Sequence, residues 1–397
     1  MSTEPFLYID AAWRSLNKQG EELCGDRIQI KRNDKGIVLV LADGLGSGVK
    51  ANILSTLTAT IIAEMIFSGM TLEEAVETMA ATLPVCRERG IAYSTFTIIQ
   101  IDYTGEVYIA EFDNPSVVVL RDGQLMHHER LMQKTHDRTI FVTKMTAQVG
   151  DCFVAFSDGV LHAGTGILLN FGWGQKEVEA FLQAEVRADD SAREITRILL
   201  ANVHYLYGCK PQDDSTVACL RIIKASDTRV MIGPPGKVEE DEKVVRRLLE
   251  ADGKKICCGG TTSQIVARFL KQEVTVDTQD IWNRDEHVPP KGYIEGLDLV
   301  TEGMLTLQQA ARFISKAEQN PAYFEELLLS KQQDGATLLA KLLLTASCIT
   351  FLVGLSDNPA HEAIDYSPIS LHAKVQLIQE MAENLRKVGR IVRVEMY

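Results

Sequence analysis

The chain has 397 residues, of which 46% are apolar and 24% are charged, the composition of an ordinary globular protein. This length is enough for two or three domains, each with a sizeable core. The formal net charge of -13 argues against binding to nucleic acid or to an anionic membrane face, since both require a basic surface.

Cysteine usage and the N-terminus indicate a cytoplasmic location. The eight cysteines include no CxxC pair, and the opening sequence MSTEPFLYID lacks a basic segment followed by an apolar one. One stretch, residues 336–355, is apolar enough to suggest a membrane span. It divides into a helix up to Leu344 and a β-branched strand over residues 348–353, so we expect a buried core segment and no membrane association.

The first predicted strands lead to an aspartate. A strand is expected over residues 6–14, and another over residues 22–31 that contains Asp26. A short apolar run over residues 37–42, rich in Val and Leu, predicts a buried strand that ends at Asp43 and Gly44. This strand carries a carboxylate at its tip, where we expect chemistry.

The segment DGLGSGVKA, from Asp43 to Ala51, contains three alternating glycines, so its backbone can turn tightly and approach a ligand or ion. It lacks the spacing of a dinucleotide loop, and no Gly-Lys-Ser/Thr follows, which argues against nucleotide binding. Helices are predicted next over residues 49–67 and 71–83.

The second of these helices has Thr71 as its N-cap and Glu74 at the capping-box position.

A block of strands follows, with hairpin signals at 103–105 and at Asp122-Gly123. The predicted strands of this block are 94–102, 106–112, 116–121 and 124–127.

The next strand, over residues 152–156, ends in SDG at Asp158 and so repeats the design seen at Asp43. After two helices, at 175–184 and 191–204, the sequence DDST leads into a strand over residues 216–223. Strands and helices come in blocks, which favours an α+β domain with mostly antiparallel sheet.

The pattern changes near residue 225, and we place a domain boundary at 224. Beyond it, strands and helices alternate: a strand over residues 229–232, a helix over 239–250, a strand over 255–258 and a helix that ends at Lys271. This alternation favours an α/β domain, residues 225–397, with a parallel sheet.

Asp26, Asp43, Asp158 and Asp213 each lie at the edge of a predicted strand. Taken singly, each is more often a turn residue. As a set of hard oxygen donors with no His or Cys at ligand spacing, they suit Mg²⁺ or Mn²⁺ better than zinc.

The aspartate-containing motifs resemble, in order and approximate spacing, those of the bacterial sporulation stage II protein E branch of the metal-dependent protein serine/threonine phosphatases, the PPM family. The resemblance covers roughly residues 5–223. The motifs are GD at 25–26, DGLGSGVKA at 43–51, SDG at 157–159 and DDST at 213–216.

The resemblance implies an α-β-β-α sandwich of two antiparallel sheets flanked by helices over residues 1–224, with two Mn²⁺ or Mg²⁺ ions at one end. By position, Asp43 would bridge the ions and the carbonyl of Gly44 would complete one coordination shell, with Asp26, Asp158 and Asp213 as the remaining ligands. Asp214 is adjacent to Asp213, and the sequence leaves open which of the two points inward.

The implied activity is hydrolysis of phosphoserine or phosphothreonine on a regulatory protein of a bacterial partner-switching pathway, by a hydroxide that the two metals activate. Eukaryotic members carry a histidine after the central Asp-Gly, where this chain has Leu45. A proton for the leaving group would then come from metal-bound water or solvent. The alternative is a phosphatase fold kept as a scaffold, whose C-terminal domain binds a small anionic ligand or a partner protein.

The C-terminal half contains one candidate anion site, formed by Gly259, Gly260, Thr261, Thr262 and Ser263 at the start of a helix. Free amides and hydroxyls there can hold a phosphate or carboxylate. The alternative is an ordinary glycine turn with a Thr or Ser N-cap. We expect this half to regulate the phosphatase or to bind a small-molecule or protein effector.

Overall fold

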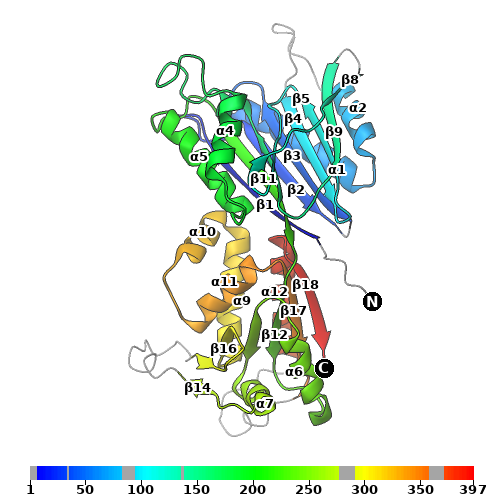
Figure 1. Ribbon diagram of the computed structural model, residues 1–397, viewed down its shortest axis with the longest axis vertical. Coiled ribbons are helices and arrows are strands. Elements are labelled where there is room, and N and C mark those ends of the chain that lie inside the picture. Colours follow the sequence, from blue (N-terminus) through cyan, green and yellow to red (C-terminus); the bar gives the residue numbers. More distant parts are fainter. Residues whose placement is uncertain (1–6, 34, 83–93, 136–137, 277–290, 357–370) are drawn as a thin grey trace. The chain divides into compact units, whose positions relative to one another are not determined.

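The computed structural model describes residues 7–33, 35–82, 94–135, 138–276, 291–356 and 371–397. These residues form two compact units, Met1–Lys224 and Ala225–Tyr397 (Figure 1). Pro289 and Pro290, around which the sequence predicts a loop, lie outside the described residues.

The first unit contains two antiparallel sheets. One has six strands in the order β2-β3-β4-β5-β9-β8, and the other has five in the order β1-β11-β10-β6-β7. The first sheet consists of β2 (Asp26–Arg32), β3 (Gly36–Gly44), β4 (Ser94–Asp102), β5 (Glu106–Phe112), β8 (Leu131–Thr135) and β9 (Arg138–Thr146). The second consists of β1 (Leu7–Leu16), β6 (Val118–Arg121), β7 (Gln124–Leu125), β10 (Asp151–Phe156) and β11 (Ser215–Lys224).

Helices cover the outer faces of both sheets, which confirms the predicted α-β-β-α sandwich (Figure 1). Helices α1 (Gly48–Phe67) and α2 (Leu72–Thr82) pack on the six-stranded sheet, and α4 (Gln175–Glu185) and α5 (Ala192–Leu206) pack on the other. The short helix α3 (Asp158–Leu161) follows β10.

Between the sheets lies one apolar core, to which alternate residues of the facing strands contribute, as the period of two along a strand requires. Ile37, Leu39 and Leu41 of β3 face it, whereas Val38, Val40 and Ala42 face the helices. Strand β3 is thus buried on both faces, which explains why its sequence is apolar without alternation.

Two parts of the sequence interpretation of this unit need correction. The strands over residues 116–127 do not continue the preceding meander, because β6 and β7 join the other sheet. Strands β8 and β9 were not predicted at all. Edge strand β8 exposes Leu131 and Met132, so its residues do not alternate between an apolar and a polar face.

Helix α1, among the described residues, has the length and composition of a membrane span, with a mean hydropathy of 1.3, and the sequence interpretation overlooked it. Core helices of globular domains meet the same criterion. Its inner face packs on β3 and β2, while Val49, Ile53, Leu57 and Ile61 are exposed on its outer face. The stretch at residues 336–355 does divide into a helix and a strand, α11 (Gly335–Thr345) and β17 (Cys348–Val353).

The second unit is an α/β domain whose sheet has the strand order β14-β15-β16-β13-β12-β17-β18. The five strands from β16 to β18 are parallel, and the short strands β14 (Thr275–Val276) and β15 (Gly292–Tyr293) add an antiparallel edge, so the expected parallel sheet is mixed. The parallel strands are β12 (Asp227–Ile232), β13 (Lys255–Cys258), β16 (Leu299–Thr301), β17 and β18 (Ile391–Met396).

In chain order the parallel strands lie 3-2-1-4-5, the arrangement of a doubly wound sheet. Apolar clusters cover both of its faces. The helices are η1 (Val238–Glu240), α6 (Asp241–Leu249), α7 (Gly260–Leu270), α9 (Met304–Gln319), α10 (Pro321–Leu329), α11 and α12 (Leu371–Lys387).

Candidate active site

The four predicted aspartates come from both sheets of the first unit. Asp26 begins β2 and Asp43 lies near the end of β3, and the antiparallel register pairs these two residues directly. Asp158 follows β10 and Asp213 precedes β11, and these two strands are also antiparallel neighbours. Each pair therefore shares one end of its sheet.

A hydrogen bond across the sandwich joins the two pairs. Ser157 Oγ donates to Asp26 Oδ2 at 2.7 Å, and the backbone N–H of Thr216 donates to Ser157 Oγ at 2.9 Å. Ser157 is fully buried and therefore fixes the Asp26 carboxylate against the other sheet. Ser157 lies in the SDG motif, but no role was predicted for it from the sequence.

Asp214 has a structural role in the loops around the site. Its Oδ1 accepts from the backbone N–H of Lys18 and its Oδ2 from that of Gly25, both at 2.9 Å. Only 5% of Asp214 is exposed, while its neighbour Asp213 is half-buried. With both oxygens of Asp214 engaged by amides, Asp213 is the residue of the DDST segment whose carboxylate is available to the cluster.

Two glycines allow close packing at the site. A Cβ on Gly44 would lie 2.1 Å from the carbonyl oxygen of Ala51 in α1, and one on Gly159 would lie 2.0 Å from that of Asp214. A side chain on Gly44 would therefore push the end of β3, which carries Asp43, away from α1. One on Gly159 would push the turn that carries Asp158 away from the Asp214 segment. Tyr207 supports the same turn by donating from its hydroxyl to the Gly159 carbonyl at 2.7 Å.

The carboxyl groups raise one another's pKa values. Burial raises the pKa of Asp26 to about 7, opposed by hydrogen bonds from Ser157 and Thr216 and reinforced by the charges of Asp214 and Asp158. Burial also raises the pKa of Asp43 well above its usual range, and the charges of Asp26 and Asp158 add to the rise. The pKa of Asp213 is raised by burial and by the charge of Asp158. A set of acids that disfavour each other's ionisation suits a nearby cation.

An unpartnered oxygen also indicates a cation. Asp26 Oδ1 is buried and has no hydrogen-bond partner among the described residues, although such an oxygen is costly to bury without a donor or an ion beside it. In the part of the chain that the structure describes, no group of three His, Cys, Asp or Glu side chains already has the geometry of a metal site. The fit therefore depends on the donor chemistry and on this oxygen.

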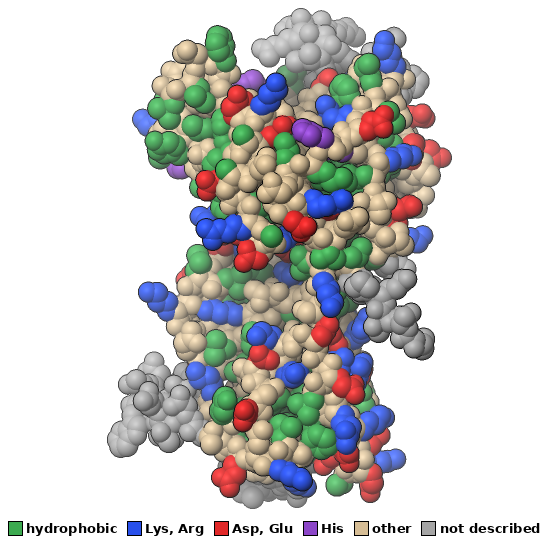
Figure 2. Space-filling view, in the orientation of Figure 1, with side chains coloured by type: hydrophobic (Ala, Val, Ile, Leu, Met, Phe, Trp, Pro, Cys, Tyr) green, Lys and Arg blue, Asp and Glu red, His purple; other side chains and the backbone are tan. Residues whose placement is uncertain are grey.

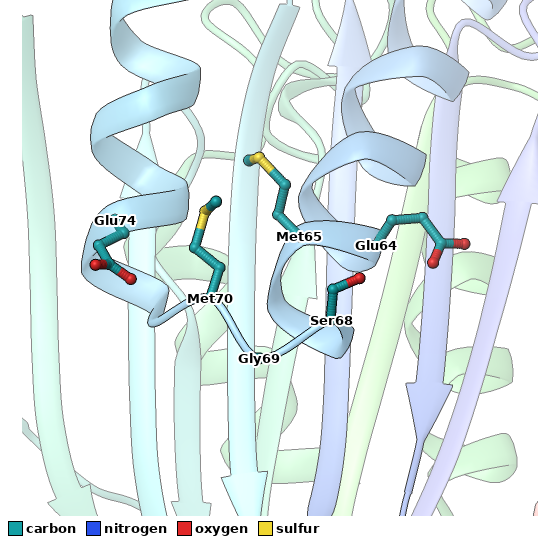
Figure 3. A pocket seen from close by; sticks show the side chains of 6 residues that line it. All are labelled: Glu64, Met65, Ser68, Gly69, Met70 and Glu74. Carbon is teal, nitrogen blue, oxygen red and sulfur yellow. The ribbon is translucent and has the colours of Figure 1, made fainter.

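The remaining candidate residues lie elsewhere. Gly259, Gly260, Thr261, Thr262 and Ser263 are in the second unit, where Gly259 is the N-cap of α7. A hollow between α1 and α2, lined by Glu64, Met65, Ser68, Gly69, Met70 and Glu74, is likewise separate from the aspartates (Figure 3). It lies at the C-terminal end of α1, about 30 Å along that helix from the end that follows Asp43.

The first unit has a PP2C-like fold, in which two sheets are flanked by helices. Residues 33–223 match the family described as stage II sporulation protein E (SpoIIE). Residues 225–397 lie outside the match.

Individual relatives resemble smaller parts of the chain. The phosphoserine phosphatase RsbX of Bacillus subtilis (strain 168) is 44% identical over 45 residues, which are 11% of this chain and 23% of that protein. The chain thus matches under a quarter of the length of this curated relative.

Two solved structures were also found to be similar. The PP2C phosphatase domain of SpoIIE from Bacillus subtilis, with a fragment of its regulatory domain, has a TM-score of 0.48 and 19% identity, covering 55% of this chain and 65% of that one. RsbX in complex with magnesium has a TM-score of 0.39 and 17% identity, covering 54% and 96% of the two chains.

Proposed function

We propose that the first unit is a divalent-metal-dependent protein phosphatase that hydrolyses phosphoserine or phosphothreonine. The observation that carries this proposal is the gathering of Asp26, Asp43, Asp158 and Asp213 from four strand ends. The SpoIIE match of residues 33–223 supports it, and so does the similarity to a protein named as a phosphoserine phosphatase.

The four aspartates and the carbonyl of Gly44 would hold two ions, Mn²⁺ or Mg²⁺. A pair of such ions lowers the pKa of a water molecule and neutralises charge on a phosphoryl group. The relative RsbX has been solved in complex with magnesium, which supports a divalent ion here.

The protein's own groups set the geometry for this chemistry. Ser157 orients the Asp26 carboxylate, and Asp214 fixes the two loops that contain Lys18 and Gly25. Leu45, after the central Asp-Gly, offers no proton, so the proton for the leaving alkoxide would come from metal-bound water or solvent. We expect the rate to show no histidine-like pKa from that position.

We further propose that the substrate is a phosphorylated regulatory protein in the bacterial cytoplasm. Acidic and basic side chains are interspersed over the face shown in Figure 2, and the chain as a whole is acidic. The positive field needed to hold a phosphoryl group would therefore have to be local and come from the ions.

The test is hydrolysis of a phosphoserine peptide by the full chain with Mn²⁺, with Mg²⁺ and with chelator. We expect metal-dependent release of phosphate, and a fall of about a hundredfold or more in Asp43→Asn, since the variant loses a charged group that would hold the ions. Asp102→Asn is the matched control, because Asp102 lies at the other end of neighbouring strand β4, paired with Gly36 of β3.

Release that is independent of metal, or equal activity in Asp43→Asn and the parent, would contradict the proposal. A folded Asp43→Asn variant with an unchanged cellular phenotype would instead favour the scaffold alternative, in which the second unit is the working part. Circular dichroism of each variant separates these outcomes from unfolding.

A further inference from the structure

The second unit has three buried threonines at the edge of its sheet where the parallel strands end. Thr262 is in the first turn of α7, Thr301 ends β16, and Thr337 is in the first turn of α11. They are 1%, 3% and 0% exposed, respectively. We call these three residues the threonine edge.

One backbone hydrogen bond and the close packing of two glycines place the three threonine segments side by side. The N–H of Gly259 donates to the carbonyl of Thr301 at 3.0 Å, and a Cβ on Gly259 would lie 2.9 Å from Thr262 Oγ1. On the other side, a Cβ on Gly335 at the start of α11 would lie 3.4 Å from Thr301 Cγ2.

The hydroxyls of the threonine edge lack the partners that buried hydroxyls normally have. Those of Thr262 and Thr337 are without a hydrogen-bond partner in the described ranges, and that of Thr301 meets only the Cys258 thiol, a weak hydrogen-bonding group. A buried hydroxyl without a hydrogen-bond partner destabilises the folded chain, so three of them at one place indicate a missing acceptor or donor.

Backbone donors converge on the same edge. Helix α7 has Gly259 as its N-cap, and α9 has Gly303, and neither glycine can supply a side-chain cap. The Gly260 N–H is used by the Glu302 carbonyl, but the N–H groups of Thr261 and Thr262 have no partner among the described residues. Such free amides at a helix start attract an anion.

The surroundings suit a phosphoryl group. Gly260 and Thr261 are exposed, so a ligand can reach the amides from solvent, and open space faces the Cα of Gly260. The aliphatic part of the Lys291 side chain passes beside Gly335, next to the threonine edge. In a doubly wound sheet, ligands bind outside the carboxyl ends of the strands, which is where this edge lies.

We propose that the threonine edge, with the free amides of Thr261 and Thr262, binds the phosphoryl group of a small molecule. The group accepts hydrogen bonds from the two amides and from the Thr262 hydroxyl. This site is separate from the aspartate cluster, and the proposal stands whether or not the first unit is a phosphatase.

The test is hydrogen exchange of the full chain in chelator, with inorganic phosphate, with adenosine monophosphate and with acetate at equal ionic strength. At about 10 mM, a ligand with a Kd of 1 mM slows exchange through local opening about tenfold. We expect such protection in peptides that cover residues 255–271, from one or both phosphates and not from acetate.

Thr262→Val is the diagnostic variant, because valine has the shape of threonine without the hydroxyl. Since that hydroxyl has no partner in the described part of the chain, the unliganded variant should be as stable as the parent, while phosphate binding weakens about ten- to a hundredfold. Thr345→Val is the control, because Thr345 is exposed at the other end of α11.

The two phosphates distinguish the source of the group. Protection by inorganic phosphate alone assigns the site to free phosphate, and stronger protection by the nucleotide assigns it to a phosphorylated metabolite. Lack of protection from either phosphate, equal protection by acetate, or undiminished protection in Thr262→Val would overturn the proposal and leave ordered water as the partner of these hydroxyls.

Discussion

At the scale of single residues, the first unit contains two kinds of aspartate that the sequence cannot tell apart. Asp213 and Asp214 are adjacent, yet Asp214 uses both carboxylate oxygens to hold backbone amides, while Asp213 remains available to the cluster. The amides that Asp214 binds lie about 190 residues earlier in the chain, at Lys18 and Gly25. No local pattern can reveal such a partner, which is why the sequence left this choice open.

The difference between these two aspartates predicts opposite effects of the same substitution. Asp214→Asn should lower the stability of the first unit by about 2 kcal/mol, because an amide group cannot accept both backbone hydrogen bonds. Asp213→Asn should leave stability nearly unchanged and weaken metal-dependent activity. Urea unfolding and phosphatase assays of both variants check this, and loss of stability in Asp213→Asn alone would reverse our assignment.

A second residue-scale prediction concerns pH. The pKa of Asp26 is about 7 in the folded chain, compared with 3.8 for an ordinary, solvated aspartate. At pH values between these two, the native state therefore binds more protons than the unfolded state. In chelator, the free energy of unfolding of the first unit should therefore fall as the pH rises from about 4 to 7, by on the order of 1 kcal/mol per pH unit.

Thermal unfolding in chelator at pH 5 and pH 8 measures this dependence. Asp26→Asn removes the titrating group and should reduce the difference between the two pH values. If the parent and Asp26→Asn respond equally to pH, Asp26 does not titrate as described.

At the scale of elements, sequence motifs predict a hydrogen bond correctly when its donor and acceptor are close in sequence. The capping box predicted at Thr71 and Glu74 is present: the Thr71 N–H donates to Glu74 Oε2 at 3.0 Å, and the Glu74 N–H donates to Thr71 Oγ1 at 3.3 Å. Both groups belong to one turn, so four residues of sequence were sufficient to predict it.

Removing this cap should destabilise α2. Thr71→Ala is expected to lower stability by about 1 kcal/mol, because the N–H of Glu74 loses its acceptor. Thr82→Ala, at the other end of α2, is the control, since its exposed hydroxyl bonds only to the carbonyl of Thr78 in the same helix. Equal losses in the two variants would show that the cap contributes nothing.

The sequence predicted β3 because its apolar run is short and is bounded by Gly36 and Asp43. The aspartates were predicted as a set from their positions at strand edges and from the resemblance of the motifs around them, and the metal roles of Asp26, Asp43, Asp158 and Asp213 remain predictions. The sequence missed β8 because an edge strand has a less regular apolar pattern. The bond from Ser157 to Asp26 crosses 131 residues and depends on how two sheets face each other, which no strand pattern determines.

At the scale of the whole molecule, each unit has its own sheets and its own apolar clusters. In the first unit β1 pairs with β11 along its full length, from Leu7 with Lys224 to Leu16 with Ser215. In the second unit the central strand β12 lies between β13 and β17.

This organisation predicts that residues 1–224 and 225–397 fold when produced separately. Each fragment should unfold cooperatively in urea, since a separate core supports it. Deleting residues 7–16 should unfold the first fragment, because β11 would lose one of its two partner strands along its full length and become a bare edge. A fragment that unfolds without cooperativity, while the full chain remains cooperative, would contradict two independent units.

The pairing of β1 with β11 also sets a schedule for synthesis. A ribosome adding about 5–20 residues per second needs roughly ten to forty seconds after making β1 before it completes β11 at Lys224. Strand β12 then emerges and must wait for β17, more than a hundred residues later. During this wait the side of β12 that pairs with β17 is an open sheet edge. Strand β12 contains Arg229, and a charge within such a strand limits aggregation of nascent chains.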